Sequence, residues 1–279
     1  EPSLAQTLPS EAGHVIAAAD ALEVTHDGPR AAGARGDYFS SALLGVSKLY
    51  DFEGRKSVPP TDVARTAASW EFGQHLHGEA YFGPRDPALY RASITATMLA
   101  HPPGLDFGGS AKGLALDRAA KVLRESGVVD AALVTAGSTT VTFGEKPESE
   151  PWRIGVEDPR EPGRVVAVVE ASSTVTVSTS GDYQQHFERD GINWHHILDP
   201  VTGRPAWGLR SLTVIGAPDG LTSDILSTAL FVMGPVRAVD YAREKDLGLY
   251  MIDAVGEVTT VGPVPGARWR LVEEAESRE

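Results

Sequence analysis

Two oxygen-bearing side chains lie four residues apart in a segment with the pattern of a helix. Asp224 and Thr228 belong to an apolar run over 222–233 that ends at Gly234-Pro235. At that spacing the carboxylate and the hydroxyl share one face of a helix. Such a pair suits a hard cation such as Mg²⁺, which prefers oxygen ligands. The alternative is that Asp224 is a first-turn acid that only interacts favourably with the helix dipole.

A glycine-rich segment over 106–113 is the second candidate, and it leads directly into a predicted helix over 111–125. Glycines before a helix let the backbone approach a ligand closely, and the helix start offers free N–H groups to a phosphate. Lys112 would add a positive charge against that anion. The alternative is a tight turn with a solvated lysine, because the segment is neither a P-loop nor a dinucleotide fingerprint.

Residues 178–183 form the third candidate, at the end of a run that alternates polar and apolar residues. Hydroxyl and N–H groups in a Ser/Thr/Gly turn can cradle a polar ligand. The alternative is an ordinary strand end with turn-forming residues.

The fourth candidate is the segment 195–205, where two histidines precede a turn built around Asp199. A histidine three residues before an aspartate can act as a general base or contact a ligand. The alternative is a structural histidine with satisfied hydrogen bonds. The histidine spacing and catalytic glutamate of zinc proteases are missing from the sequence, which argues against that class.

These segments need a scaffold of short strands and a few longer helices. Apolar or alternating runs predict strands at 131–136, 152–156, 165–171, 173–178, 212–217, 249–252 and 268–272. Helical patterns are expected over 11–22, 62–72, 111–125, 222–233 and 235–245. This mixture indicates an α+β fold.

Composition limits the kinds of partner. The 279 residues include 25 Lys and Arg against 38 Asp and Glu, a net charge of −13. That balance argues against nucleic acid or an anionic membrane as the main partner, since both require a basic face. The sequence has no cysteine, which excludes thiolate metal sites, disulfides and a lipidation cysteine. We see no integral membrane segment and no signal peptide, and the localisation stays open.

Taken in order, these blocks resemble the ApbE-type FAD:protein FMN transferases, or flavin transferases. The resemblance covers residues 86–263 and is strongest over 106–117, 178–205 and 212–234. It implies a single α+β domain with mixed or antiparallel sheets and a few long helices. Residues 1–104 would be a shortened, divergent N-terminal part, 105–265 the core that binds flavin and metal, and 273–279 a frayed tail.

The resemblance also implies roles for individual residues. His196 and Asp224 would be catalytic, with His196 activating the acceptor hydroxyl. Asp224, Thr228 and the carbonyl of Gly109 would hold Mg²⁺. The flavin and phosphate site would be shaped by Gly108, Gly109, Ser110, Lys112, Thr179, Ser180, Gly181, Asp182 and Asp199. One departure is a Gly137-Ser138-Thr139 turn where members commonly have Gly-Gly-Asp, which removes a carboxylate.

The implied function is Mg²⁺-dependent transfer of FMN from FAD, the substrate, to a Thr or Ser hydroxyl of an acceptor flavoprotein, with release of AMP. The nearest alternative is an FAD pyrophosphatase, in which water replaces the acceptor hydroxyl. A non-catalytic FAD-binding relative is the alternative from a different class.

Overall fold

The computed structural model describes residues 38–39, 43–50, 52, 58–61, 106–200 and 202–272. The chain divides into two compact units, which are described separately: Glu1–Phe107 with Gln185–Pro205, and Gly108–Gln184 with Ala206–Glu279. The helices expected over 11–22 and 62–72 and the tail at 273–279 lie outside the described residues. That residues 1–279 form one domain stays a prediction.

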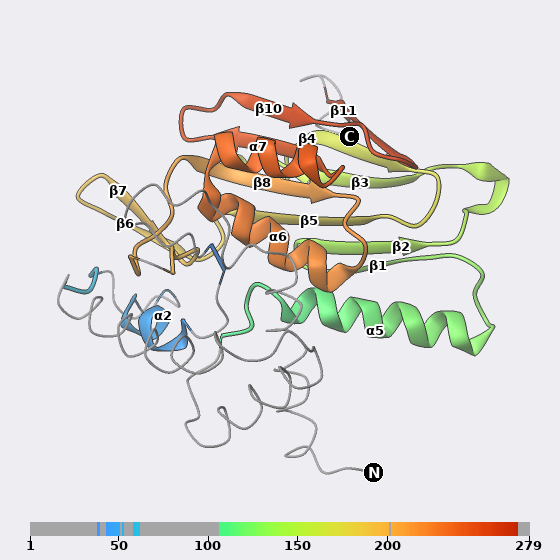
Figure 1. The fold of residues 1–279 in the computed structure, drawn as a ribbon, viewed down its shortest axis with the longest axis horizontal. Helices are drawn as coiled ribbons and strands as arrows, with labels where there is room; N and C mark the ends of the chain where they lie inside the picture. The colour runs from blue at the N-terminus through green and yellow to red at the C-terminus, as the bar shows by residue number, and fades with distance from the viewer. Residues whose placement is uncertain are drawn as a thin grey trace, which may run out of the picture. The chain divides into compact units, whose positions relative to one another are not determined.

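The larger unit is built on two antiparallel sheets (Figure 1). The first has six strands in the order β1 (Ala132–Ala136), β2 (Thr139–Phe143), β5 (Thr176–Gly181), β8 (Leu209–Ile215), β9 (Gly248–Asp253) and β10 (Val258–Val261). The second has three, in the order β11 (Ala267–Leu271), β4 (Val165–Ala171) and β3 (Trp152–Glu157). A short 3-10 turn, η2 (Pro147–Ser149), lies between β2 and β3 in the chain. The expected α+β class with antiparallel sheets is confirmed.

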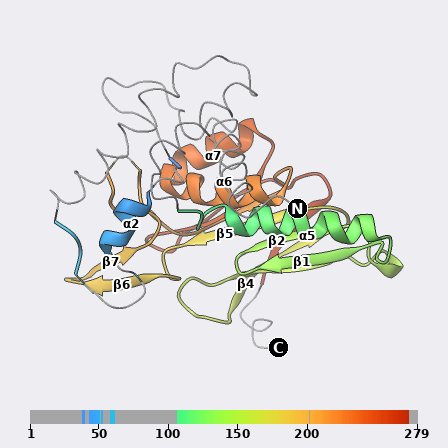
Figure 2. The same cartoon turned by 90° about the horizontal axis from the view of Figure 1, so that it is seen from below.

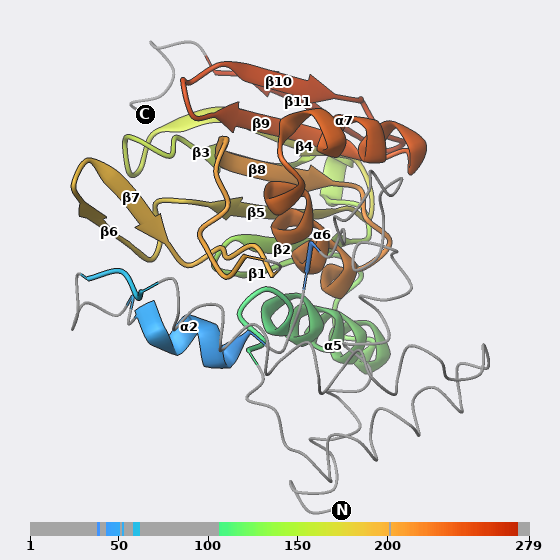
Figure 3. The same cartoon turned by 60° about the vertical axis from the view of Figure 1, so that its left-hand side comes forward.

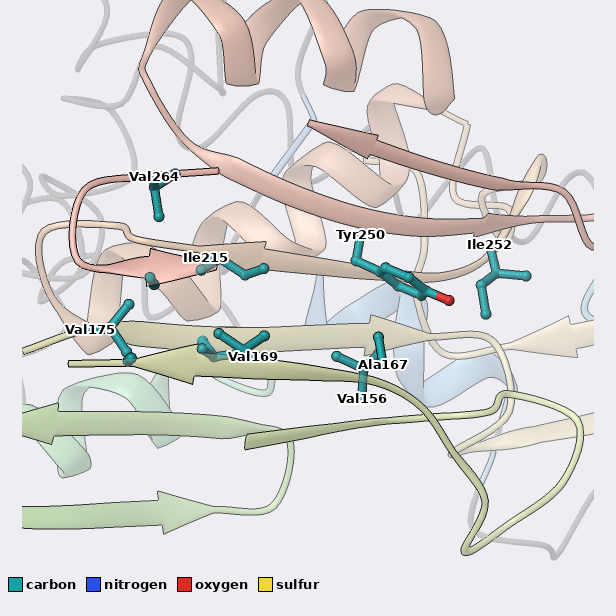
Figure 4. Packing of buried hydrophobic residues seen from close by; sticks show 11 residues of the cluster. Val156, Ala167, Val169, Val175, Ile215, Tyr250, Ile252 and Val264 are labelled. Atoms are coloured by element: carbon teal, nitrogen blue, oxygen red, sulfur yellow. The ribbon is translucent and has the colours of Figure 1, made fainter. Parts of the chain in front are cut away.

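The core of this unit fills the space between the two sheets (Figure 4). Val177 of β5, Ile215 of β8 and Tyr250 of β9 meet Val169 of β4 there, and all four are nearly inaccessible to solvent. Side chains alternate between the two faces of a strand. The neighbours of Val177 on β5 therefore point to the other face of the six-stranded sheet.

Three helices cover that other face: α5 (Ala111–Ser126), α6 (Gly220–Met233) and α7 (Pro235–Glu244) (Figure 3). Helix α5 packs on β1 and β2, α6 on β2, β5 and β8, and α7 on β9 and β10. Asp219 caps the start of α6 by accepting the N–H of Thr222. Pro235 then starts α7 directly after Gly234, because proline has no N–H to satisfy at a helix start. None of the described helices is long and apolar enough to span a membrane.

The expected elements of this unit match the structure closely, with one correction. Helices α5, α6 and α7 and strands β1, β3, β4, β8, β9 and β11 lie within three residues of their predicted bounds. Strand β5, expected over 173–178, runs from Thr176 to Gly181, three residues later at both ends. Residues 178–181 are thus part of the strand itself, and the turn expected there begins after it.

The smaller unit is described through α2 (Leu44–Tyr50) and the hairpin of β6 (His186–Arg189) and β7 (Ile192–His195) (Figure 2). Its core combines Val46 and Tyr50 of the helix with Leu198, and Trp194 of the hairpin packs against them. The ring of Tyr50 stacks on Phe52 with 5.0 Å between centroids. The Tyr50 hydroxyl donates to the carbonyl of Gly203 at 2.6 Å. These contacts hold Leu198 and Gly203 to the helix.

Candidate functional site

Asp224 is the centre of the site, and it is buried in the fifth position of α6 with 2% of its surface exposed. Its Oδ2 accepts the backbone N–H of Gly113 at 3.0 Å. Its Oδ1 accepts the hydroxyl of Thr139 at 3.2 Å. The alternative reading of Asp224 as a first-turn acid is wrong, because α6 has no acidic residue in its first turn and its cap is Asp219.

Lys112 lies directly against this carboxylate. Its Nζ is 3.0 Å from Asp224 Oδ1 and donates to the carbonyl of Gly108 at 2.8 Å. The lysine side chain is 35% exposed, whereas that of Asp224 is 3% exposed. A positive charge is therefore held between one carboxylate oxygen and one backbone carbonyl, at the edge of a buried group. The alternative reading of Lys112 as a solvated lysine is wrong, because its ammonium is paired with Asp224.

Two glycines let α5 and α6 touch backbone to backbone at this point. A Cβ built on Gly113 would lie 2.1 Å from the carbonyl oxygen of Gly220, and one on Gly220 would lie 2.8 Å from the carbonyl oxygen of Gly113. No real Cβ contact is that short, so only glycine fits this approach. The contact brings the N–H of Gly113 and the side chain of Lys112 to Asp224.

Asp117, one turn further along α5, fastens the start of α6. Its two carboxylate oxygens accept the N–H groups of Gly220 and Leu221 at 2.7 and 2.8 Å. Burial raises the pKa of Asp117 above its ordinary value, and these two N–H groups act in the opposite direction. The carboxylate thus satisfies donors at a helix terminus that have no partner inside the helix.

A chain of hydroxyl groups lines α6 beside the carboxylate. Ser178 Oγ lies 3.0 Å from Thr139 Oγ1 and 3.2 Å from Ser227 Oγ. Ser180 Oγ lies 2.9 Å from Ser227 Oγ and 3.2 Å from Thr228 Oγ1. Ser178 and Ser180 are two apart on β5, so both face the helix. The strand thereby joins Asp224 and Thr228 through one connected network.

The donor set fits a hard divalent cation such as Mg²⁺. Asp224 Oδ1 and the carbonyl oxygen of Gly108 both lie within 3.0 Å of the Lys112 ammonium. These two oxygens therefore already bind one cation. Thr228 adds a hydroxyl one turn from Asp224. All these atoms are oxygens, the ligand type that Mg²⁺ prefers. Among the described residues, no three His, Cys, Asp or Glu side chains cluster as a metal site.

The other predicted site residues of the larger unit lie in the turn before α5 and on or just after β5. Gly108, Gly109 and Ser110 form the turn before α5, and Ser110 is fully buried at its start. Thr179 points to the face opposite α6, where its hydroxyl bonds that of Thr213 at 2.8 Å. The side chain of Thr179 thus lies on the face away from Asp224, and the predicted role of Thr179 in shaping the flavin and phosphate site stays a prediction.

Gly181 and Asp182 lie at the end of β5. A Cβ on Gly181 would lie 2.2 Å from Cε1 of Tyr183. Glycine at this position therefore leaves room for the Tyr183 ring. Asp182 is buried and forms an ion pair with Arg210 of β8 at 3.3 Å. Binding roles for Gly181 and Asp182 stay predictions.

His196 and Asp199 belong to the smaller unit. The His196 N–H donates to the carbonyl of Gln185 at 3.1 Å. Asp199 Oδ2 accepts the hydroxyl of Thr202 at 3.1 Å, and its carbonyl accepts the N–H of Gly203 at 2.8 Å. The expected turn around Asp199 is therefore present, while the catalytic role of His196 and the binding role of Asp199 stay predictions.

Three contributors to the site were not predicted from the sequence: Asp117, Gly220 and Ser227. The Asp219-Gly220 pair directly before the helix pattern was an available signal, because it is typical of a capped start with close backbone approach. Asp117 had no such signal. Its role depends on a helix 103 residues further along the chain.

Known proteins resemble this chain in sequence and in structure. A model of the ApbE family matches residues 4–252. The FAD:protein FMN transferase of Treponema pallidum is 33% identical over 221 residues, which is 75% of this chain and 58% of the relative. That of Rhodobacter capsulatus is 42% identical over 151 residues, 53% of this chain and 28% of the relative.

Two crystal structures show the same fold. The ApbE protein of Thermotoga maritima has a TM-score of 0.67 and 30% identity, covering 89% of this chain and 75% of its own. The apo flavinyl transferase ApbE of Pseudomonas stutzeri has a TM-score of 0.64 and 28% identity, covering 93% and 72%. The chain spans about half the length of the first curated relatives, 58% and 48%. These matches confirm the resemblance found in the sequence blocks, and the chain belongs to the ApbE family.

Proposed function

We propose that this protein transfers FMN from FAD to a Thr or Ser hydroxyl of an acceptor flavoprotein and releases AMP, with Mg²⁺ as cofactor. The observation that carries the proposal is the buried carboxylate of Asp224, held with Lys112 and the Gly108 carbonyl at the start of α5. The names of the relatives support it, since those proteins are FAD:protein FMN transferases.

The residues around Asp224 supply what breaking a pyrophosphate requires. Asp224, Thr228 and a carbonyl of the 108–109 turn would hold Mg²⁺, which when bound neutralises charge on the phosphate oxygens. Lys112 brings a further positive charge to the same place. The start of α5 adds N–H groups that favour an anion.

The transfer step exchanges one phosphorus–oxygen bond for another. The acceptor hydroxyl oxygen bonds to the FMN phosphorus, the bond to the AMP phosphate breaks, and AMP leaves with that electron pair. His196 takes the hydroxyl proton in this scheme. A positioned general base typically contributes about 10²–10⁴-fold to a rate.

The test is to incubate the chain with FAD, Mg²⁺ and a peptide carrying a Thr among Gly, Ser and Ala residues. Peptide-linked FMN, free FMN and AMP are then quantified. We expect flavinylated peptide with Asp240→Asn, a change at an exposed acid of α7, and none with Asp224→Asn. AMP with free FMN and no labelled peptide would indicate the pyrophosphatase. FAD binding without either product would indicate the non-catalytic relative.

A second prediction separates catalysis from binding. His196→Ala should slow peptide flavinylation by about 10²–10⁴-fold while FAD binding is retained. His186→Ala, at an exposed position of β6, is the matched control and should keep the wild-type rate. Equal rates for the two variants would remove His196 from the mechanism.

A further inference from the structure

The Lys112 ammonium lies where a metal ion would meet Asp224. Of the two carboxylate oxygens, Oδ2 accepts the backbone N–H of Gly113 in the buried contact between α5 and α6. Oδ1 is the oxygen that the ammonium approaches, at 3.0 Å. The same ammonium also takes the carbonyl of Gly108 at 2.8 Å. One cation thus holds the Asp224 oxygen proposed to bind a divalent ion, together with a carbonyl next to Gly109 in the same turn.

A divalent ion and the ammonium cannot share these oxygens. Mg²⁺ binds oxygen at about 2.0–2.1 Å, so an ion on Oδ1 would lie close to the ammonium, and like charges at that separation repel. The N–H of Gly113 bonds to Oδ2 and the Thr139 hydroxyl bonds to Oδ1, each taking one acceptor site of the carboxylate. A metal on Oδ1 would therefore take the acceptor site that Lys112 now holds.

Lys112 is the partner that is able to leave. Its side chain is 35% exposed and has a flexible four-carbon stem, so it can swing away without a change in the backbone. Asp224, at 3% exposure, has no such freedom. Once released, the ammonium remains at the start of α5, beside the place where the phosphates of FAD would bind.

Resting on the proposed function, we propose that Lys112 is an exchangeable resident cation of the metal site. It neutralises the buried Asp224 until a divalent ion displaces it, and it then turns to the anionic ligand. Lys112 is thus a positioning residue that links metal binding to binding of the pyrophosphate. Metal binding to the flavin-free protein has to break the pair between Lys112 and Asp224.

Calorimetry with MgCl₂ and no FAD tests the exchange directly. Lys112→Met removes the competing charge and keeps most of the stem, so Mg²⁺ should bind roughly tenfold more tightly, within the about 5–150-fold range of coupled sites. Lys112→Arg keeps a charge at the carboxylate and should not gain affinity. Lys121→Met, at an exposed lysine of the same helix, is the matched control and should behave as wild type. Equal or weaker Mg²⁺ binding by Lys112→Met would overturn the proposal.

A measurement on the wild-type chain avoids any folding defect of the variants. Acetylation of lysines by an N-hydroxysuccinimide ester is followed by mass spectrometry, with Lys121 as internal reference. Lys112 should react slowly without metal, several times faster with saturating MgCl₂, and slowly again when FAD is added. Unchanged labelling of Lys112 at a Mg²⁺ concentration that raises the melting temperature would show that the pair persists, contrary to the proposal.

Failure of the proposed function is distinguishable from failure of this exchange. Both measurements report Mg²⁺ binding without any flavin transfer. A chain that labels no peptide but shows the Mg²⁺-dependent change at Lys112 contradicts the transferase alone. A chain that labels peptide but shows no such change contradicts the exchange alone.

Discussion

The two carboxylate oxygens of Asp224 have different partners: Oδ2 accepts a backbone N–H, whereas Oδ1 meets a hydroxyl and an ammonium. Single substitutions test what each partner contributes. Thr139 is fully buried and donates its hydroxyl to Oδ1. Thr139 therefore orients Asp224 without adding charge.

Replacing Thr139 by Val should keep the shape and remove this hydrogen bond together with the one to Ser178. We expect the free energy of unfolding to fall by about 1 kcal/mol for each bond, the usual net value, and Mg²⁺ affinity to fall with it. Urea unfolding and calorimetry measure the two effects. Thr140→Val is the control, because Thr140 bonds Thr135 instead. If both variants lose Mg²⁺ affinity equally, Thr139 has no special part in orienting Asp224.

Tyr183 gives a pH dependence that belongs to a single residue. Burial, and then the carboxylates of Glu157, Asp182 and Asp158, raise its pKa from 10.0 to about 12. Because the folded pKa lies above the unfolded one, the protonated phenol stabilises the fold fully below pH 10. That contribution is lost as the pH rises from 10 to about 12.

Tyr183→Phe removes this titration. Relative to wild type, the variant should gain stability at pH 11 compared with pH 8, because phenylalanine carries no proton to lose. Thermal unfolding of both proteins at the two pH values gives the comparison. A wild-type-to-variant difference that is the same at both values would contradict the prediction.

Sequence reasoning at the residue scale succeeded where a contact is local. The spacing of Asp224 and Thr228 correctly placed both in one helix, because four residues make about one turn. It did not find that Lys112 pairs with Asp224, since 112 residues separate them. It also grouped Thr179 with Ser180, although neighbours on a strand face opposite sides.

At the scale of elements, the close approach of α5 and α6 builds the site. Gly113→Ala would place a methyl group 2.1 Å from the Gly220 carbonyl oxygen, so the helices must separate. We expect a loss of about 1–3 kcal/mol from overpacking, larger than the about 1 kcal/mol gained from alanine's helix propensity. Mg²⁺ affinity should fall as well, because the Gly113 N–H leaves Asp224.

Denaturant unfolding and calorimetry again give the measurements, and Lys121→Ala is the control at an exposed position of α5. A more stable Gly113→Ala protein with unchanged Mg²⁺ binding would mean that helix propensity outweighs the contact. In that case the two helices would have room to adjust without moving Asp224.

The elements of the larger unit were predictable where their patterns are strong. Strand β4 is a run of valines and alanines with the predicted bounds, and α6 ends at Gly234 as expected. Strand β2 was not predicted, because Thr139–Phe143 is only five residues long and directly follows the turn at Gly137-Ser138. The hairpin β6–β7 was also not predicted, since its residues are mostly polar and exposed.

At the scale of the whole molecule, the proposed ligand is anionic whereas the protein is acidic. The net charge is −13, so the chain as a whole repels the phosphates of FAD. Local positive charge at the start of α5, from Lys112 and a divalent ion, would offset that repulsion. The proposed chemistry is thus confined to a small region of favourable charge.

The division into two units predicts that the larger one folds alone. Gly181 at the end of β5 pairs with Ser211 of β8, so residues 185–205 leave and re-enter the sheet at neighbouring positions. A chain of residues 108–272 with a short Gly/Ser linker in place of 185–205 should unfold cooperatively and bind Mg²⁺ as the full chain does. Its flavin transfer should be slower than that of the full chain by at least the about 10²–10⁴-fold expected for loss of His196. Absence of a cooperative thermal transition would instead support a single domain over residues 1–279.

The pairing of β5 with β8 on either side of an inserted segment also has an evolutionary consequence. A segment that starts and ends at adjacent strands can lengthen, shorten or diverge between related genes while the register of β5 and β8 is inherited unchanged. Mutations in the part that carries His196 can then accumulate without disturbing the hydroxyl network around Asp224, although the proposed transfer uses both.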